Sequence, residues 1–289
     1  MRVLFIKLLL HLFALLPLAI THTIANILGR LLARSSSLRI TNVTRTNISL
    51  CFPQLSAAEQ ADLVKHSLIE TCKTFIEIGK IWLSPLDKAL ALVCEVKGEE
   101  CVQQAFEQGK GVIFLTPHFG AWEMAALYAT SRYTMSALYR PPKLHGLNDL
   151  IHTARERAGG NLMPVNRAGV RALYQQLRQG KAAGILPDQV PTDNNAGIFV
   201  PFFGVKAFTT VLVSRLANKT GASIIFTYAE RLPNSKGFKI HFFPAPTEIT
   251  SSNLEEACTA LNKGIEHCVE NCPAQYLWSY KRFKMSVNY

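Results

Sequence analysis

His118 and Glu123 are a histidine and a carboxylate separated by four residues, a pair that can perform general-base catalysis. A carboxylate that holds one imidazole nitrogen fixes the tautomer, and the other nitrogen is then free to take a proton from a hydroxyl. The same spacing also arises by chance, in which case the histidine only forms a hydrogen bond within a loop. The pair alone therefore leaves a catalytic and a structural interpretation open.

The segments on either side predict that the pair lies where a strand passes into a helix. Residues 111–115 are apolar and β-branched, as in a buried strand, and residues 121–129 are rich in Ala, as in a helix. Open α/β sheets bind ligands at such junctions. We expect His118 in the turn and Glu123 in the first helical turn, with Gly120 allowing the turn to be tight.

Apolar runs alternate with helical patterns beyond residue 92, which predicts an α/β fold with a mixed, mostly parallel sheet flanked by helices. The expected strands are residues 93–97, 111–116, 134–139, 161–165, 183–187, 222–229 and 238–243. The expected helices are residues 99–108, 121–130, 146–158, 167–179, 207–220 and 253–270, preceded by a long helix that begins at a capping box (Ser56 to Glu59) and continues to Leu83. Residues 188–206 are expected to form a long loop, and loops of that length are usually functional or mobile.

The N-terminus carries an apolar run over residues 3–20, interrupted by Pro17. As a helix it would be about 27 Å long, close to the thickness of a membrane's hydrocarbon core. No convincing cleavage site follows it, which argues against a signal peptide. We therefore expect a membrane anchor within residues 1–34 and one domain over residues 35–289, separated by the polar stretch 35–47. Arginines after the run favour a cytoplasmic domain, and whether the anchor spans the membrane or lies at its interface stays open.

The composition favours an anionic partner. The formal net charge is +11, while 48% of the residues are hydrophobic and 18% are charged. Such a basic chain suits a membrane surface, an anionic substrate or nucleic acid, but no nucleic-acid-binding motif is visible, so we favour the membrane and expect no nucleic acid. The seven cysteines include no Cys-x-x-Cys pair, which predicts reduced thiols and no metal site.

Several basic residues outside the His118 region are candidates for binding phosphate. Arg140 follows an expected strand and is held by Pro141 and Pro142, so its guanidinium either presents two parallel hydrogen bonds to a phosphate or simply caps the strand at the surface. Arg167 and Arg171 lie four apart on an expected helix and either bind phosphate or are simply solvated. A basic cluster near the C-terminus suits a membrane interface or ordinary solvation: Lys281, Arg282 and Lys284, after Tyr276 and Trp278.

The pattern of His118 and Glu123 resembles the HX4(D/E) signature of the glycerolipid acyltransferases. Further runs are similar to those of the bacterial lipid A biosynthesis (late) acyltransferases, and they occur in the family's order between about residue 40 and residue 284. These runs are residues 47–53, 138–142, 184–189, 200–204 and 275–278, with the basic residues up to 284.

The resemblance implies a glycerolipid acyltransferase-like fold with a retained N-terminal anchor in the bacterial inner membrane. It implies that His118 deprotonates an acceptor hydroxyl, that Glu123 orients the imidazole, and that Asp188 belongs to the active site, with Gln189 beside it. The acceptor would be a lipid A precursor, and the donor a thioester of acyl carrier protein or, as a substitute, acyl-CoA. We expect no further cofactor and no covalent acyl-enzyme, because no Gly-x-Ser-x-Gly motif is present.

Two alternatives are left open by the sequence. One is acyl transfer to a different lipid, such as a glycolipid, a phospholipid or an ornithine lipid. The other is a non-catalytic membrane-associated scaffold, which would have no reason to keep His118 and Glu123 together with Arg140 and Asp188.

Overall fold

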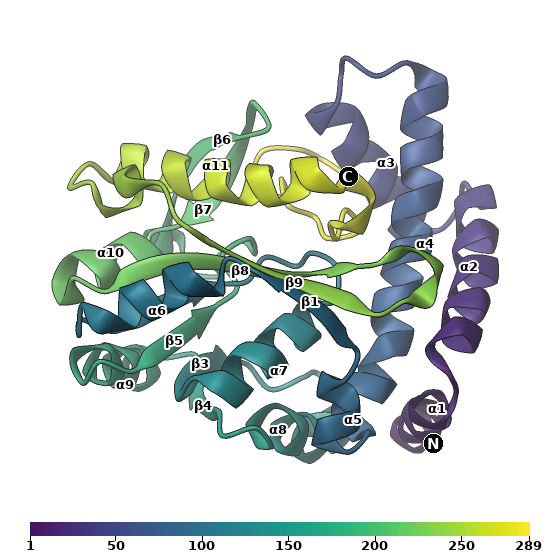
Figure 1. Ribbon diagram of the computed structural model, residues 1–289. Helices are drawn as coiled ribbons and strands as arrows, with labels where there is room; N and C mark the ends of the chain where they lie inside the picture. Colours follow the sequence, from purple (N-terminus) through teal and green to yellow (C-terminus); the bar gives the residue numbers. More distant parts are fainter.

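Seven strands form the central sheet of the computed structural model, which describes residues 1–289 (Figure 1). They lie in the order β1-β9-β8-β2-β5-β3-β4. The five strands from β8 to β4 are parallel, whereas β9 is antiparallel to β8 and pairs in parallel with β1. All seven predicted strands are confirmed: β1 Val93–Lys97, β2 Val112–Leu115, β3 Met135–Tyr139, β4 Asn161–Pro164, β5 Ala182–Ile185, β8 Ser223–Arg231 and β9 Phe238–Pro244.

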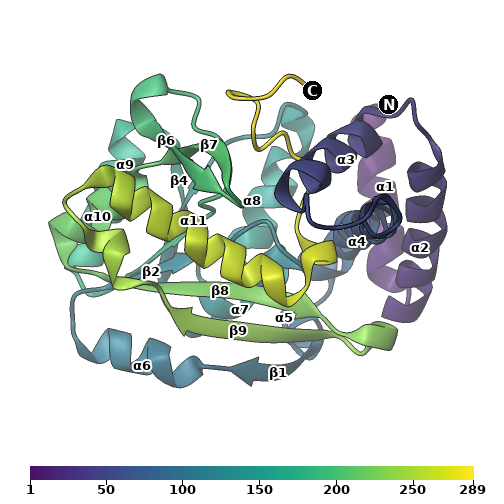
Figure 2. The ribbon, with the colours of Figure 1, turned by 90° about the horizontal axis from the view of Figure 1, so that it is seen from above.

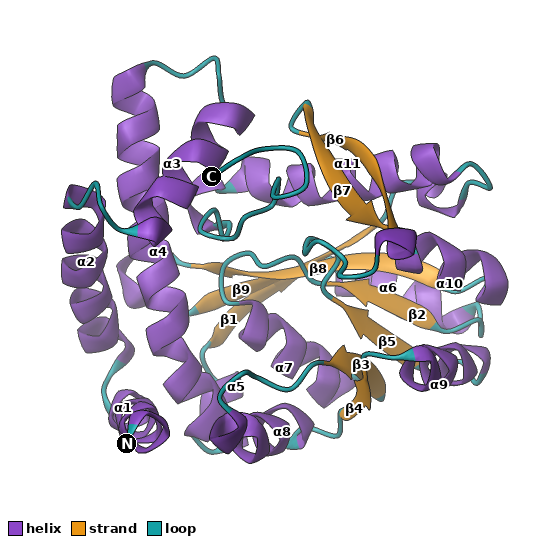
Figure 3. Ribbon diagram, turned by 180° about the vertical axis from the view of Figure 1, so that it is seen from behind, coloured by secondary structure: helices purple, strands orange, loops and turns teal.

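Helices cover both faces of the sheet, and the side chains of its central strands are therefore buried on both sides. On β2, Ile113 and Leu115 join one core, while Val112 and Phe114 join the other. The first core includes side chains of α9 (Arg167–Arg178), α10 (Leu212–Thr220) and α11 (Leu254–Asn271). The second includes α6 (Glu99–Glu107) and α7 (Trp122–Arg132), and α8 (Asn148–Glu156) leads into β4 (Figure 3).

The predicted loop over residues 188–206 is wrong in its second half, and so is the expected start of the next helix. Strands β6 (Gly197–Phe202) and β7 (Val205–Thr210) form an antiparallel hairpin, and α10 begins only at Leu212. The turn is made by Phe203 and Gly204, both with positive φ. Buried side chains on both strands, Val200, Phe202 and Phe208 among them, stabilise the hairpin against the rest of the protein.

The polar stretch 35–47, expected to separate two parts of the chain, mostly belongs to a helix, α3 (Arg39–Cys51). Its polar face is buried because it has partners: Asn47 Nδ2 donates hydrogen bonds of 2.7 Å to the carbonyls of Trp278 and of Tyr280. The long helix α4 (Ala57–Leu83) is confirmed together with its capping box at Ser56, and the short α5 (Leu86–Leu90) follows it.

The N-terminal apolar run forms two helices rather than one, because the first helix ends just before Pro17. Helices α1 (Arg2–Leu15) and α2 (Leu18–Arg34) both pack against α4 (Figure 2). The contact is close: a Cβ on Gly79 of α4 would lie 2.4 Å from the Leu10 carbonyl oxygen. None of the helices combines the length and the apolar character needed to cross a membrane.

A buried ionic network joins these N-terminal helices to the sheet. Arg231 of β8 pairs with Glu70 at 2.6 Å and with Glu77 at 2.7 Å, both on α4. Glu77 also lies 2.5 Å from His22 of α2. Burial favours the neutral acid, but the Arg231 and His22 side chains hold the pKa of Glu77 below its usual value. The network thus fixes α2 and α4 relative to the end of β8.

Candidate functional site

His118 lies in a turn between β2 and α7 that is fixed by segments from far along the chain. The His118 carbonyl accepts from the Leu277 N–H at 3.0 Å, and the Gly120 N–H donates to the Gln275 carbonyl at 2.9 Å. Gly120 has φ +56°, and a Cβ there would lie 2.1 Å from the Ala229 carbonyl oxygen. Only glycine fits this close approach without strain, as the sequence predicts.

The carboxylate that holds the imidazole is Asp188, three residues beyond the end of β5. His118 Nδ1 lies 2.8 Å from Asp188 Oδ1, and the backbone N–H of His118 donates to Oδ2 at 2.9 Å. Asp188 is 2% exposed. Burial would raise its pKa, but the His118 imidazole and the hydrogen bonds from His118 outweigh burial and lower it. Asp188 is thus an ionised acceptor that requires a proton on Nδ1 and leaves Nε2 free.

The second imidazole nitrogen faces the surface. His118 Nε2 accepts a hydrogen bond from the side-chain amide of Gln189, at 3.1 Å, and Gln189 is exposed. The ring of Trp122 packs edge-on against the imidazole, with 5.0 Å between centroids. A hydroxyl group that displaces the Gln189 amide can therefore reach Nε2 from solvent.

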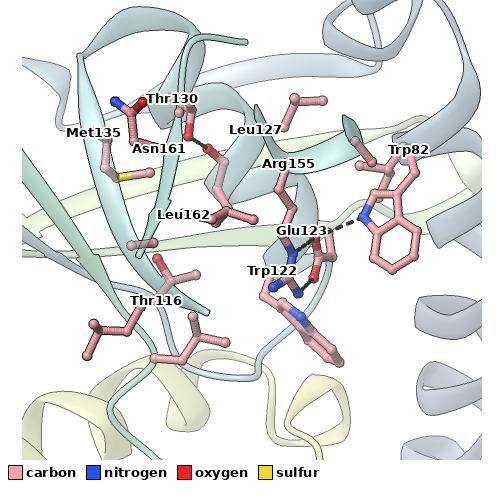
Figure 4. A pocket seen from close by; sticks show the side chains of 17 residues that line it. Trp82, Thr116, Trp122, Glu123, Leu127, Thr130, Met135, Arg155, Asn161 and Leu162 are labelled. Atoms are coloured by element: carbon pink, nitrogen blue, oxygen red, sulfur yellow. Dashed lines mark hydrogen bonds and ion pairs between the residues drawn. The ribbon is translucent and has the colours of Figure 1, made fainter. Parts of the chain in front are cut away.

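Glu123 forms no hydrogen bond or ion pair with the imidazole, contrary to the expected pairing with His118. It is buried in the first turn of α7 and accepts from Trp82 Nε1 at 2.9 Å (Figure 4). Arg155 of α8 donates to both of its oxygens, at 2.5 and 3.2 Å. Burial opposes ionisation, yet Arg155 and Trp82 lower the pKa of Glu123. Glu123 is therefore an ionised carboxylate in an ion pair with Arg155.

A narrow apolar cavity of about 70 Å³ adjoins this ion pair (Figure 4). Thr116 and Trp122, which flank the His118 turn, are among its lining residues, as are Glu123 and Arg155. The rest of its wall is mainly aliphatic and comes from β3, β4, α4 and α7, with Ile81, Leu127, Met135, Leu138 and Leu162 as examples. The imidazole, which packs against Trp122, thus lies close to a cavity that suits a hydrocarbon chain.

The remaining predicted site residues lie at different distances from this centre. Arg140 is exposed, and its Nη2 donates to Thr192 Oγ1 at 3.3 Å, within the segment that also carries Asp188 and Gln189. Arg167 begins α9 and lines a separate groove together with Arg171. The fold therefore brings His118, Asp188 and Gln189 together, places Arg140 next to their segment and leaves Arg167 apart.

Three site features are not predicted by the sequence. Arg155 and Trp82, the partners of Glu123, lie in segments without any signature. Arg282, expected at a membrane interface or in solvent, is 2% exposed and donates to the Phe208 carbonyl at 2.8 Å. Burial and the nearby Asp188 carboxylate raise the pKa of the Tyr276 phenol well above its usual value, so Tyr276 is a neutral wall of the site.

Comparisons with known proteins agree with the resemblance in the motifs. The family model described as "Bacterial lipid A biosynthesis acyltransferase" matches residues 3–285. The chain is 28% identical over 270 residues to the lipid A biosynthesis lauroyltransferase of Escherichia coli K12, covering 93% of this chain and 87% of that one. It is 28% identical to the palmitoleoyltransferase of the same strain (88% and 81% covered) and 26% identical to its myristoyltransferase (82% and 73% covered). With nearly its whole length matched, this chain belongs to the bacterial lipid A biosynthesis acyltransferases.

Proposed function

We propose that this acyltransferase moves a fatty acyl group from an acyl carrier protein thioester to a hydroxyl group of a lipid A precursor, with His118 as the general base. One observation carries the mechanism: an imidazole held at Nδ1 by buried Asp188 presents Nε2 to solvent beside an apolar cavity. The family names given above support the acceptor class.

In the proposed reaction, the acceptor hydroxyl replaces the Gln189 amide at His118 Nε2. The hydroxyl oxygen attacks the thioester carbonyl carbon while Nε2 takes its proton, and the Asp188 carboxylate stabilises the imidazolium that forms. The C–S bond then breaks as the carbonyl re-forms. The proton returns from Nε2 to the leaving sulfur, so the products are an ester and a free thiol, with no acyl-enzyme.

Glu123 has an indirect role in this proposal. Its ion pair with Arg155 connects the start of α7 to α8 and holds one wall of the cavity beside His118. The two carboxylates near the imidazole therefore have different roles: Asp188 positions the His118 base, and Glu123 positions one wall of the apolar cavity.

The apolar cavity is proposed to take the acyl chain. Its volume of about 70 Å³ is well below the roughly 300–1,000 Å³ of ligand pockets, so it accepts only part of a chain unless side chains move. Acyl-CoA is proposed as a substitute donor because it carries the same thioester. Arg140 and Gln189 are proposed to contact the acceptor, since Gln189 bonds to His118 Nε2 and Arg140 bonds to Thr192 of the same segment.

Membrane association, with the catalytic part on the cytoplasmic side of the inner membrane, is also proposed. Helix α1 exposes a row of large apolar side chains, with Leu4 at 73%, Leu8 at 66% and Leu12 at 48% exposure. These positions lie four apart and share one face of the helix. A basic cluster on α2, α3 and α4, formed by Arg30, Arg34, Arg45 and Lys65, lines a surface pocket at the C-terminal end of α2 and suits anionic headgroups.

Two measurements test the proposed function. Mass spectrometry of lipid A from cells with and without the protein should differ by one acyl chain. With purified protein and acyl carrier protein thioester, His118→Ala should reduce turnover by at least about 10²-fold. His66→Ala, at an exposed histidine of α4, is the matched control and should retain activity. Full activity of folded His118→Ala would refute the mechanism, and an unchanged lipid A with acylation of another lipid would refute the acceptor.

A further inference from the structure

An open groove of about 740 Å³ lies between α9 and α10, separate from the apolar cavity. Both of its rims are basic: Arg167 and Arg171 on α9, and Arg215 and Lys219 on α10. All four side chains are exposed, and no acidic residue lines the groove. None of the four forms an ion pair within the chain.

The spacing of these cations creates electrostatic repulsion when no partner is bound. Each rim holds two like charges at positions i and i+4, which repel each other on the same helix face. Two such pairs border one groove, so carboxylates bound there would relieve repulsion as well as form ion pairs. The rims are therefore complementary to an anionic partner.

The floor of the groove is apolar. Val170 and Tyr174 of α9, together with Leu212 of α10, are half-buried, and Leu216 of α10 is buried. An apolar strip between two basic rims matches a helix whose apolar stripe is flanked by acidic residues, the helix-in-groove mode of recognition. A free phosphate would use the rims but not the floor.

The groove is connected to the site by a short segment. Asp188 and Gln189 contact His118, and the same segment continues to Ala196, which lines the groove. Helix α9 also begins just after β4. Because β4 is parallel to β2 and β5, its carboxyl end lies at the same end of the sheet as the carboxyl ends of β2 and β5, which lead into His118 and Asp188. A partner in the groove is thus at the same edge of the sheet as the imidazole.

The groove lies at the opposite end of the molecule from the apolar N-terminal helices. Figures 1, 2 and 3 all place α9 and α10 on one side of the sheet and α1 and α2 on the other. A lipid surface that receives the exposed leucines of α1 is therefore distant from these rims, which favours a protein partner over a membrane.

We infer that this groove docks an acidic amphipathic helix of the acyl carrier protein that delivers the thioester. Carboxylates of the carrier pair with the four rim cations, and apolar side chains of its helix cover the floor. The thioester arm then reaches His118 along the segment from Ala196 to Asp188. This inference rests on the proposed function, because it names the partner that supplies the acyl group.

The test compares two double charge reversals in the full chain. Arg215→Glu with Lys219→Glu alters one rim, and Lys88→Glu with Lys97→Glu makes the same change in net charge at exposed positions of α5 and of the opposite edge strand β1. Each protein is assayed with acyl carrier protein thioester and with an acyl-pantetheine thioester, which has the same reactive group and no protein. Binding of the unacylated carrier is measured by calorimetry.

We expect the rim variant to raise the KM for the carrier thioester at least about tenfold and to weaken carrier binding equally, while kcat and turnover of acyl-pantetheine stay at the wild-type level. The control variant should behave as wild type. An unchanged KM, an equal loss with both donors, or a loss only of binding to phosphatidylglycerol vesicles would overturn the inference. Failure of the proposed function looks different, because wild type would then acylate from neither donor.

Discussion

Asp188 and Glu123 are both buried carboxylates near one imidazole, but only Asp188 bonds to it. Asp188→Asn replaces an ionised acceptor by an amide that can present an N–H to Nδ1, so the wrong tautomer is favoured. We expect turnover to fall at least about 10²-fold with little change in the thermal midpoint. The measurement is kcat together with a thermal unfolding curve.

Glu123→Gln should lower the stability of the fold more than Asp188→Asn does and turnover less. It leaves the Arg155 guanidinium without its ionic partner, at a cost of about 2 kcal/mol in the free energy of unfolding, less than for a fully buried pair because Arg155 is 33% exposed. The proton-transfer groups stay in place, so the loss of turnover should be smaller than in Asp188→Asn. If Glu123→Gln were the slower enzyme and equally stable, the orienting role would return to Glu123.

Arg140 provides a test of acceptor recognition. We expect Arg140→Ala to lose efficiency far more on a phosphorylated acceptor than on its dephosphorylated form, because only the phosphate uses the guanidinium. Arg140→Lys should be intermediate, since it keeps the charge and loses the bidentate geometry. Equal losses on both acceptors would place Arg140 in donor binding or in holding Thr192.

The sequence identifies the candidate active-site residues, but it does not show which of them bond to one another. His118 and Asp188 are separated by 70 positions, and no local pattern states which carboxylate reaches the imidazole. Glu123 is the nearer acid in sequence, but the first turn of α7 directs it toward Arg155 and Trp82. Such pairings depend on how strands β2 and β5 align, which is a property of the assembled sheet.

Among the elements, the turn that carries His118 depends on Gly120. Gly120→Ala puts a methyl group into the Ala229 carbonyl and requires a residue with a Cβ to adopt φ +56°. We expect a loss of about 1–3 kcal/mol in stability and a larger proportional loss of turnover, because the imidazole moves. Gly109→Ala is the matched control, with φ +69° and no atom within 4 Å of the added Cβ. Equal activity of the two variants would contradict the argument.

The elements that are predictable from sequence are those with a strong local signal. The seven sheet strands are apolar runs between helical segments, and each predicted start and end lies within two residues of the observed one. The sequence does not predict hairpin β6–β7, because Pro201 disfavours a strand and the residues before Leu212 are compatible with the start of a helix. It does not predict helix α3, because the Thr and Asn residues of that helix resemble a linker until the partners of Asn47 are known.

At the scale of the whole molecule, the exposed face of α1 is the surface that we propose binds the membrane. Replacing Leu4, Leu8 and Leu12 by Gln removes three apolar side chains, each worth about 1.5–3 kcal/mol when fully buried. We expect at least about a 100-fold lower partition onto anionic vesicles, with catalysis on a detergent-dispersed acceptor preserved, because these side chains point away from α4. Val165→Gln, an exposed apolar position on the far side, is the control in a vesicle sedimentation assay.

The bridge between the His118 turn and residues 275–277 sets the moment at which the enzyme becomes active during its synthesis. Helices α1 and α2 precede the His118 turn in the chain and leave the ribosome before it. The turn has no partners until Gln275 and Leu277 emerge, long after His118 itself. A chain that terminates before Gln275 therefore lacks the partners of the His118 turn, and we expect it to be inactive.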